Sequence, residues 1–301
     1  MAELRFEGRA ALVTGAGRGV GREIARLLAA RGACVVVADS GVALDGTGPL
    51  DAAPALETVA GILAAGGKAV ASVGSVAEPA QAMAMVEAAL SAFGRLDIVV
   101  NNAGVSDPAL FEDLTLEQVR RMLDVHYLGS IHVLQAAWRH LKASGAGRVV
   151  NGCAEGMLGV HPMNVAYAAS KAAVFGLTRA LAVEGAAHGV GVNALCARAT
   201  TRLANRETVA KVWGRRPQDI APMPPMAPEL CAPVAAYLGH PSCALNGEVL
   251  VAGAGKVMRL AVVQTVGMED PELTPEKVAE GLNAVLDLEG ARLFPILLGG
   301  R

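Results

Sequence analysis

The chain has 301 residues, a length that suggests one large domain or two small ones. Apolar residues make up 53 % and charged residues 18 %, which allows a buried core and excludes a disordered chain. The formal net charge of -2 gives no reason to expect nucleic acid or an anionic membrane surface as a partner.

Short apolar runs alternate with helical patterns along the chain. Strands are expected at 11–15, 34–39, 68–73, 96–104, 148–152, 191–196 and 248–253. Helices are expected near 20–31, 55–65, 79–93, 115–142 and 164–188. This alternation is typical of βαβ units joined by right-handed crossovers. The sequence therefore predicts an α/β fold with a doubly wound parallel sheet of seven strands and helices on both faces.

Two later segments interrupt this regular alternation. Residues 197–228 are rich in Arg and Pro and are expected to form a mobile substrate lid within a domain that spans 1–260. The lid's cations suit an anionic handle such as the phosphates of coenzyme A, or they form a solvated helix face. Residues 261–301 are predicted to be a C-terminal extension with one helix, which Thr274 caps and which buries an apolar face.

The cysteines and the N-terminus bear on the cellular compartment. The five cysteines are odd in number, widely spaced and free of any C-x-x-C pair, and the six histidines lack metal-ligand spacing. The first ten residues carry charges and few apolar side chains, so no secretory signal is expected. No run approaches the roughly 18 apolar residues of a membrane span. We therefore expect a cytoplasmic protein with no metal site and no membrane-spanning segment.

A glycine-rich turn, TGAGRGVG at 14–21, lies between the first strand and the first helix. Its glycines allow a tight turn and close approach of a ligand, and the following helix offers free N–H groups to a pyrophosphate. The spacing T-G-x-x-x-G-x-G differs from the usual G-x-G-x-x-G, and such a turn can also be a simple tight connection. Its position between a strand and a helix favours a dinucleotide site.

Asp39 ends the second strand and bears on which dinucleotide binds. An acid there accepts hydrogen bonds from an adenosine ribose diol and repels a 2′-phosphate. Arg18, inside the glycine turn, would instead favour a phosphate, and Asp39 could also be an ordinary turn residue. The balance predicts NAD as the cofactor.

Tyr167 and Lys171 stand one helical turn apart, so their side chains share a face of the predicted helix. A free tyrosine has a pKa near 10, and a neighbouring ammonium group favours its phenolate. The pair could then take a hydroxyl proton from a substrate or return one to a carbonyl. The alternative is an exposed Tyr/Lys pair on an amphipathic helix.

With TGAGRGVG, NNAG at 101–104 and YAASK at 167–171, the chain resembles the short-chain dehydrogenase/reductase family over about residues 5–255. The loop after Asp39, HYLGS at 126–130 and NGEVLVAGAGK at 246–256 are similar to one subgroup, the hydroxyacyl-CoA dehydrogenase domains of peroxisomal multifunctional enzymes of type 2. The resemblance implies a Rossmann-like sheet, an oxidoreductase active on secondary alcohols, and a homodimer or homotetramer that pairs its long helices.

The resemblance also implies which residues serve the site. The implied cofactor-binding residues are Thr14, Gly15, Gly17, Arg18, Gly19, Val20, Gly21, Asp39, Ser75, Val76, Asn102, Ala103, Gly104, Tyr167 and Lys171. The catalytic residues implied are Tyr167, Lys171 and His126, which stands where the family usually has asparagine. His126 could carry a proton-relay water or be a satisfied core histidine.

One catalytic position departs from the family pattern. The family's serine stands thirteen residues before the tyrosine, and here that position is Ala154. Loss of one such donor costs about 2.7–4 kcal/mol of transition-state stabilisation. Cys153, His161 and Asn164 are candidate substitutes near the substrate, or else a packed thiol and loop polar groups.

Two functions are consistent with these residues. The first is an NAD-dependent oxidoreductase that interconverts a secondary alcohol and a ketone on a small-molecule substrate, for which a 3-hydroxyacyl-CoA or steroid-like compound is expected, in lipid metabolism. The second is a catalytically impaired homologue that binds NAD and acts as a partner subunit, which the loss of the serine at Ala154 favours.

Overall fold

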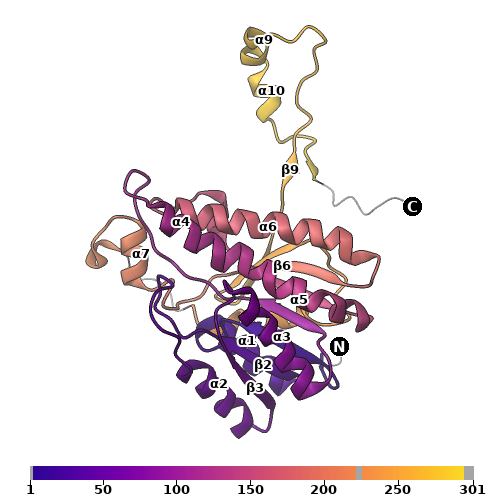
Figure 1. Ribbon diagram of the computed structural model, residues 1–301. Helices are drawn as coiled ribbons and strands as arrows, with labels where there is room; N and C mark the ends of the chain where they lie inside the picture. Colours follow the sequence, from indigo (N-terminus) through magenta and orange to yellow (C-terminus); the bar gives the residue numbers. More distant parts are fainter. Residues whose placement is uncertain (1–2, 222–225, 295–301) are drawn as a thin grey trace.

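An eight-stranded sheet forms the centre of the molecule in the computed structural model, which describes residues 3–221 and 226–294 (Figure 1). Its strand order is β3-β2-β1-β4-β5-β6-β7-β8. The strands are β1 (Ala10–Thr14), β2 (Cys34–Asp39), β3 (Lys68–Val73), β4 (Ile98–Asn101), β5 (Arg148–Cys153), β6 (Gly191–Ala197), β7 (Val249–Gly253) and β8 (Lys256–Leu260). The first seven are parallel, so all their carboxyl ends meet at one edge.

The chain reverses direction across the sheet between β1 and β4. β1 pairs with β2 on one side and with β4 on the other, so the connections on its two sides run outward in opposite directions. Ligands of open α/β sheets bind at such a switch point, outside the carboxyl ends of the strands. The topology therefore places the expected site above β1, β4 and β5.

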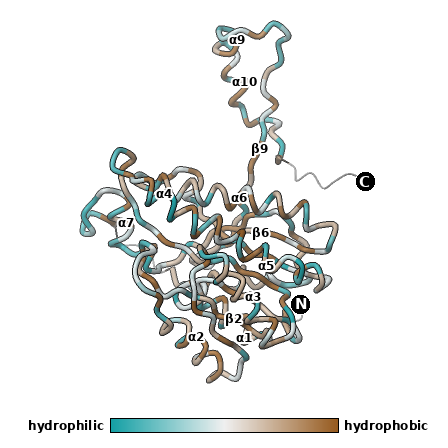
Figure 2. The backbone as a smooth tube through the Cα atoms, viewed as in Figure 1, coloured by the Kyte–Doolittle hydropathy of each residue, from teal (hydrophilic) through white to brown (hydrophobic). Residues whose placement is uncertain are grey.

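Helices cover both faces of the sheet. They are α1 (Gly19–Ala30), α2 (Ala53–Ala64), α3 (Pro79–Phe93), α4 (Leu116–Leu123), α5 (Gly129–Ala143), α6 (Val165–Ala186), α7 (Arg206–Val212) and α8 (Ala232–Leu238). α1, α2 and α8 pack in one hydrophobic cluster, and α3, α5 and α6 pack in another on the opposite face. The strands lie between these two helical layers, and their apolar runs, such as that of β2, are coloured brown in Figure 2.

The expected long helix near 115–142 is present but is not uniform. α4 and α5 are joined by a π-helical turn, Asp124–Leu128, which contains the buried His126. Thr115 caps α4 reciprocally with Gln118. π-Turns inside α-helices occur frequently at functional sites.

The predicted α/β class, the parallel arrangement and the seven predicted strands are confirmed, and an eighth strand adds to them. β8 pairs antiparallel with β7 after a tight turn at Gly255. Most of its side chains are exposed, so the buried apolar run that marks the other strands is missing from its sequence. The sequence pattern therefore could not separate β8 from the C-terminal extension.

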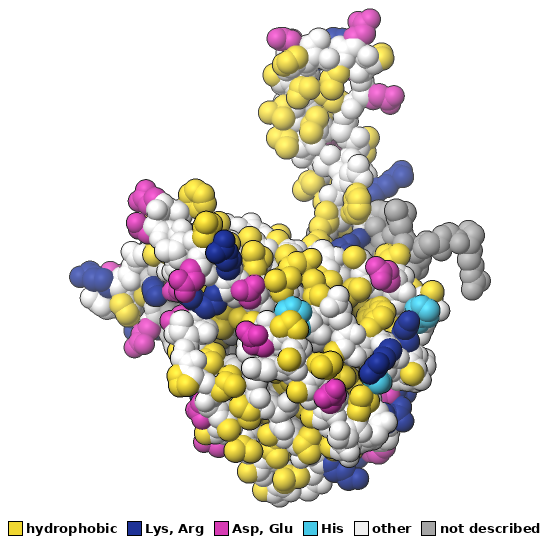
Figure 3. Space-filling model, viewed as in Figure 1, with side chains coloured by type: hydrophobic (Ala, Val, Ile, Leu, Met, Phe, Trp, Pro, Cys, Tyr) yellow, Lys and Arg dark blue, Asp and Glu magenta, His cyan; other side chains and the backbone are white. Residues whose placement is uncertain are grey.

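Beyond β8 the chain leaves the main body as an arm, drawn in yellow in Figure 1. The arm pairs β9 (Val263–Gln264) with β10 (Arg292–Leu293) and contains α9 (Pro275–Glu280) and α10 (Leu282–Leu286). Thr274 caps α9 as expected, but Gly281 separates two short helices where one was expected. The side chains expected to be buried, such as Val278 and Leu282, are exposed. Figure 3 shows apolar side chains, in yellow, over much of the surface of the arm.

Among the residues that the structure describes, no helix is both long and apolar enough to cross a membrane.

Candidate active site

A cavity of about 500 Å³ opens at the carboxyl edge of the sheet, at the switch point between β1 and β4. Its wall includes the start of α1, the end of β5, the helix α6 and the first part of the lid. The expected residues that line it are Arg18, Gly19, Val20, Asn102, Gly104, His126, Cys153, Ala154, Tyr167 and Lys171. The fold thus brings together residues that are up to 153 positions apart in the chain, from Arg18 to Lys171.

The glycine turn delivers the start of α1 to this cavity. Arg18 occupies the N-cap position in an extended conformation, and no side chain caps the helix. The first N–H groups of α1 therefore remain available to an anion, as a pyrophosphate-binding turn requires. A Cβ atom on Gly15 would come within 2.8 Å of the Ala103 backbone, and one on Gly21 within 2.3 Å of the Gly15 carbonyl. The glycines therefore let the turn pack against β1 and β4.

Thr14 and Asn102 tie this turn to β4. The Thr14 hydroxyl oxygen accepts hydrogen bonds from the backbone N–H groups of Asn102 and Ala103, at 3.0 and 3.1 Å. The Asn102 amide donates to the carbonyl groups of Thr14 and Gly15. Thr14 itself is buried and does not line the cavity, so its contribution is to hold the turn in place.

Asp39 faces a smaller hollow next to the main cavity. One carboxylate oxygen accepts from the Gly17 N–H at 2.8 Å, and the other accepts from the Gly41 N–H at 2.7 Å. Gly15, Ser75, Val76, Ala103 and Gly104 line the same hollow. A carboxylate has about four acceptor sites, so Asp39 can still accept from a ribose diol. The glycine turn, Asp39 and this hollow fit the dinucleotide predicted from the sequence.

Tyr167 and Lys171 lie on one face of α6, in the wall of the main cavity. The Lys171 ammonium group donates a 2.7 Å hydrogen bond to the Gly152 carbonyl and lies 5.6 Å from the centre of the Tyr167 ring. Burial raises the pKa of the Tyr167 phenol, contrary to the lowered pKa expected from its lysine neighbour. Desolvation disfavours a phenolate, and here the lysine is bound to a carbonyl.

A family model described as "short chain dehydrogenase" matches residues 9–211, which contain the glycine turn, NNAG and the Tyr167–Lys171 pair. The chain belongs to the short-chain dehydrogenase family. A short-chain type dehydrogenase/reductase of Mycobacterium tuberculosis is 39 % identical over 289 residues, which cover 95 % of this chain and 96 % of the relative.

Two further matches extend the comparison. The peroxisomal multifunctional enzyme type 2 of Mus musculus is 36 % identical across 96 % of this chain, but this chain spans only 38 % of that enzyme. The crystal structure of carveol dehydrogenase from Mycobacterium avium, in complex with NAD, matches with a TM-score of 0.73 and 26 % identity. That match covers 83 % of this chain and 97 % of the other.

His126 in this short-chain dehydrogenase is only 1 % exposed, and both of its ring nitrogens have partners. Nε2 accepts from the Val105 N–H at 3.0 Å, and Nδ1 lies 2.7 Å from the Ser170 hydroxyl. Burial, followed by the charge of Lys171, holds the pKa of His126 well below its usual value. This geometry agrees with the alternative of a core histidine whose ring nitrogens are both hydrogen-bonded, and the bond to Ser170 helps to position α6. His126 nevertheless also lines the cavity.

Ala154 and its neighbours occupy different environments. Ala154 and Cys153 both line the cavity, so the position of the family's serine faces this cavity. His161 is exposed and packs edge-on against Trp213, with ring centres 5.5 Å apart. Asn164 precedes α6 without capping it, and neither it nor His161 lines the cavity. Of the three candidate substitutes, only Cys153 reaches the cavity.

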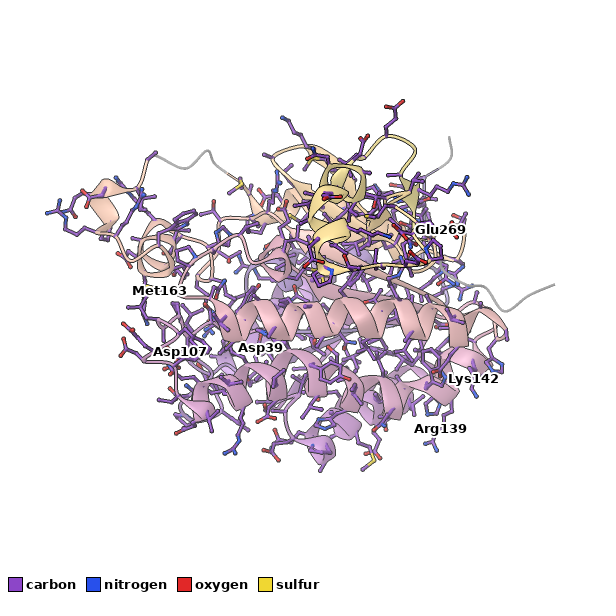
Figure 4. All side chains as sticks on the ribbon, turned by 90° about the horizontal axis from the view of Figure 1, so that it is seen from above. Asp39, Asp107, Arg139, Lys142, Met163 and Glu269 are labelled. Carbon is purple, nitrogen blue, oxygen red and sulfur yellow. The ribbon has the colours of Figure 1, made fainter. Side chains whose placement is uncertain are left out.

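Most cations in the described part of the lid already contact carboxylates or backbone carbonyls of this chain. Arg198 forms a bidentate ion pair with Glu155, and Arg216 pairs with Asp219. Arg206 donates to backbone carbonyls within the lid, and Lys211 faces Asp107. Asp107 and Met163 mark the lid end of the molecule in Figure 4, opposite Lys142 and Arg139. Residues 222–225 of the expected lid lie outside the described residues.

Arg202 was expected from the sequence only as one of the lid cations that suit an anionic handle, and not as a residue next to Asp39. It lines both the main cavity and the hollow around Asp39, and its guanidinium group donates to the Val42 carbonyl at 2.9 Å. Burial, with the charge of Arg18 nearby, lowers the pKa of Arg202. The only signal in the sequence was an arginine shortly after β6, in a segment that contains five other cations.

Asn151 was also missed, because a polar residue inside an apolar strand gives no signal of its own. It is fully buried in β5, accepts a hydrogen bond from Asn101 of β4 and donates one to Thr178 of α6, both at 3.0 Å. Asn151 therefore links two strands of the sheet to the helix that carries Tyr167 and Lys171. Among residues 3–221 and 226–294, no group of three His, Cys, Asp or Glu side chains could hold a metal ion.

Proposed function

We propose that this chain is an NAD-dependent oxidoreductase that interconverts a secondary alcohol and a ketone. The observation that carries the proposal is the presence of Tyr167, Lys171 and the uncapped start of α1 in the wall of one cavity. The turn that would bind a dinucleotide and the pair that would transfer a proton therefore face the same cavity. The match to a carveol dehydrogenase solved with NAD supports the cofactor.

The residues of the site divide the work between binding and proton transfer. The start of α1 and the glycine turn would bind the pyrophosphate, and Asp39 would bind the adenosine ribose. NAD, when bound, supplies the hydride acceptor. The Tyr167 phenol would take the proton of the substrate hydroxyl. The positive charge of Lys171 would oppose the burial that raises the pKa of Tyr167, and Lys171 would also hold the nicotinamide ribose.

For the substrate we propose a 3-hydroxyacyl-CoA. The support is the resemblance to hydroxyacyl-CoA dehydrogenase domains and the 36 % identity to a peroxisomal multifunctional enzyme. The segment at 197–228 would act as the substrate lid, with Arg215 and Arg202 as cations that have no carboxylate partner within 4 Å among the described residues. A steroid-like alcohol is the alternative substrate in the same reaction class.

The proposal is tested by NADH formation with a panel of 3-hydroxyacyl-CoAs and hydroxysteroids. Tyr167→Phe should lower kcat/KM by about 10²–10⁴, the usual contribution of a general acid or base. Tyr237→Phe is the matched control, because Tyr237 lies on α8 and does not line the cavity. Equal losses in the two variants would contradict the role of Tyr167.

A second candidate function follows from Ala154, which lines the cavity without a hydroxyl. A homologue that binds NAD but has lost efficient turnover could serve as a partner subunit. The same experiment separates the two functions when NAD binding is measured by calorimetry. Tight NAD binding with no turnover on any member of the panel would support the second candidate and contradict the first.

We also propose that the chain forms a homodimer or homotetramer through α4, α5 and α6. Exposed apolar side chains on these helices, among them Leu116 and Val165, support this association, as does the apolar surface of the arm. Light scattering of the full chain should give a mass of two or four subunits. A monomer at micromolar concentration would overturn the proposal. The five unpaired cysteines support a reducing compartment such as the cytoplasm.

A further inference from the structure

Two cysteines lie side by side at the floor of the candidate active site. Cys153 ends β5, and Cys196 is its register partner in the neighbouring parallel strand β6. Side chains of register partners in a parallel sheet point to the same face, and both cysteines belong to one small hydrophobic cluster. They are 6 % and 1 % exposed, and neither is bonded to another cysteine.

The spacing of the two strands suits a covalent bond between these thiols. Neighbouring strands lie about 4.7–4.9 Å apart, and disulfides span Cα separations of about 4.4–6.8 Å. Both residues stand at or next to the last residue of their strands, where the backbone can adjust more freely than at the centre of the sheet. No other cysteine of the chain pairs in register with a second one across the described strands.

The two thiols differ in access and in chemistry. Cys153 lines the cavity of about 500 Å³, whereas Cys196 lies behind it and does not. A hydrogen bond from Cys196, together with the charge of Lys171, lowers the pKa of the Cys153 thiol against the opposing effect of burial. The hydrogen bond to Cys153 and burial raise the pKa of Cys196. Cys153 is therefore the thiol that a small oxidant reaches first, and in the more reactive form.

We propose that Cys153 and Cys196 form a peroxide-sensitive dithiol site within the candidate active site. The Cys153 thiolate attacks one oxygen of hydrogen peroxide, which breaks the O–O bond and yields a sulfenic acid and hydroxide. The Cys196 sulfur then attacks the Cys153 sulfur and displaces hydroxide, which leaves as water after protonation. In total, two thiols are oxidised to one disulfide and one peroxide is reduced to two waters.

The disulfide would act directly on Lys171. The Gly152 carbonyl, one residue before Cys153, accepts the 2.7 Å hydrogen bond from the Lys171 ammonium group, and the Cys153 sulfur lies 3.4 Å from the Lys171 carbonyl. Movement of the end of β5 toward β6 therefore displaces the partner that holds this lysine. The predicted loss of turnover rests on the proposed function, whereas formation of the disulfide does not.

The proposal is tested by oxidising the protein with hydrogen peroxide and mapping its disulfide-linked peptides by mass spectrometry under non-reducing conditions. Free thiols should fall by two from the original five, and the intact mass should fall by two hydrogen atoms. Tryptic digestion should yield one cross-linked species that joins peptide 149–171 to peptide 180–198. Dithiothreitol should restore the thiols and any turnover lost. Oxidation that leaves these two peptides unlinked would overturn the proposal.

Two variants keep the result interpretable. In Cys196→Ala, the resolving thiol is missing, so peroxide should leave a sulfenic acid on Cys153 that dimedone captures. Cys243→Ala removes a buried thiol on the opposite side of the sheet and should give the same cross-link as the unchanged protein. A failure of Cys196→Ala to trap dimedone, when the protein is folded, contradicts the assignment of Cys153 as the attacking thiol. Neither readout needs turnover, so an inactive protein would still test the site.

Discussion

His126 Nδ1 and the Ser170 hydroxyl lie 2.7 Å apart, inside the helix layer that carries the proton-transfer pair. Because the Val105 N–H can only donate, the Nε2 atom that it contacts must be the unprotonated nitrogen. The proton is therefore on Nδ1, which donates to Ser170, and Ser170 donates in turn to the Tyr167 carbonyl at 2.8 Å. The neutral imidazole thus links the loop after β4 to the helix α6.

This arrangement predicts a loss of stability in mild acid. The pKa of His126 is lowered in the folded protein, so the folded state favours the neutral ring. The contribution of this neutral ring to the free energy of unfolding is complete above the unfolded pKa of about 6.5, and it is lost as the pH falls below that value. The slope should reach about 1.4 kcal/mol per pH unit. Urea unfolding at several pH values between 7.5 and 5.5 measures it.

A pair of variants isolates this titration. His126→Asn removes the titrating ring and should flatten the dependence of the unfolding free energy on pH in this range. His188→Asn changes an exposed histidine near the end of α6 and should leave that dependence unchanged. An unaltered slope in His126→Asn would show that other groups cause the acid sensitivity.

Replacement of Asp39 by serine should change the cofactor preference. Asp39→Ser removes the carboxylate that accepts from Gly17 and Gly41, so affinity for NAD should fall while discrimination against NADP weakens. The ratio of the two dissociation constants, measured by calorimetry, gives the result. Asp113→Ser, on the exposed loop before α4, is the control, because Asp113 lines neither hollow of the site. A ratio that stays constant in Asp39→Ser would mean that other residues select the cofactor.

Restoration of a hydroxyl at position 154 should raise turnover. Ala154 has an extended backbone that a serine can adopt, and its side chain faces the cavity. One added donor to the developing oxyanion contributes about 2.7–4 kcal/mol, so kcat/KM should rise about 10²–10³-fold in Ala154→Ser. Ala199→Ser adds a hydroxyl elsewhere in the same cavity wall and should give no such gain. If the two variants behave alike, position 154 is not where the substrate oxygen is bound.

Much of the fold and part of the site could be predicted from the sequence. The glycine spacing of the turn at 14–21 is enough to predict its backbone conformation. Strands such as CVVVAD are recognisable because both faces of the sheet are covered, which makes the strand apolar along its length. Tyr167 and Lys171 were predictable as a pair because helical spacing alone puts them on one face.

The remaining features depend on contacts between distant segments. Arg202 is held next to Asp39 by its hydrogen bond to the Val42 carbonyl, 160 positions away in the chain. No local sequence pattern predicts such a contact. The register of Cys153 with Cys196 required the order of the strands, which the sequence pattern does not give. The direction of the Tyr167 pKa was unexpected for the same reason, since burial in the folded protein sets it.

The buried Asn151 should contribute strongly to stability because it has two side-chain partners in the core. Asn151→Ala leaves Asn101 and Thr178 without their shared partner, and an unsatisfied buried polar group costs about 1–3 kcal/mol. Asn283→Ala, on the exposed arm, should change the unfolding free energy by less than about 0.5 kcal/mol. The midpoint of urea unfolding gives both values. A cost for Asn151→Ala no larger than that of the control would mean that Asn101 and Thr178 find other hydrogen bonds, and that Asn151 does not hold α6 to β5.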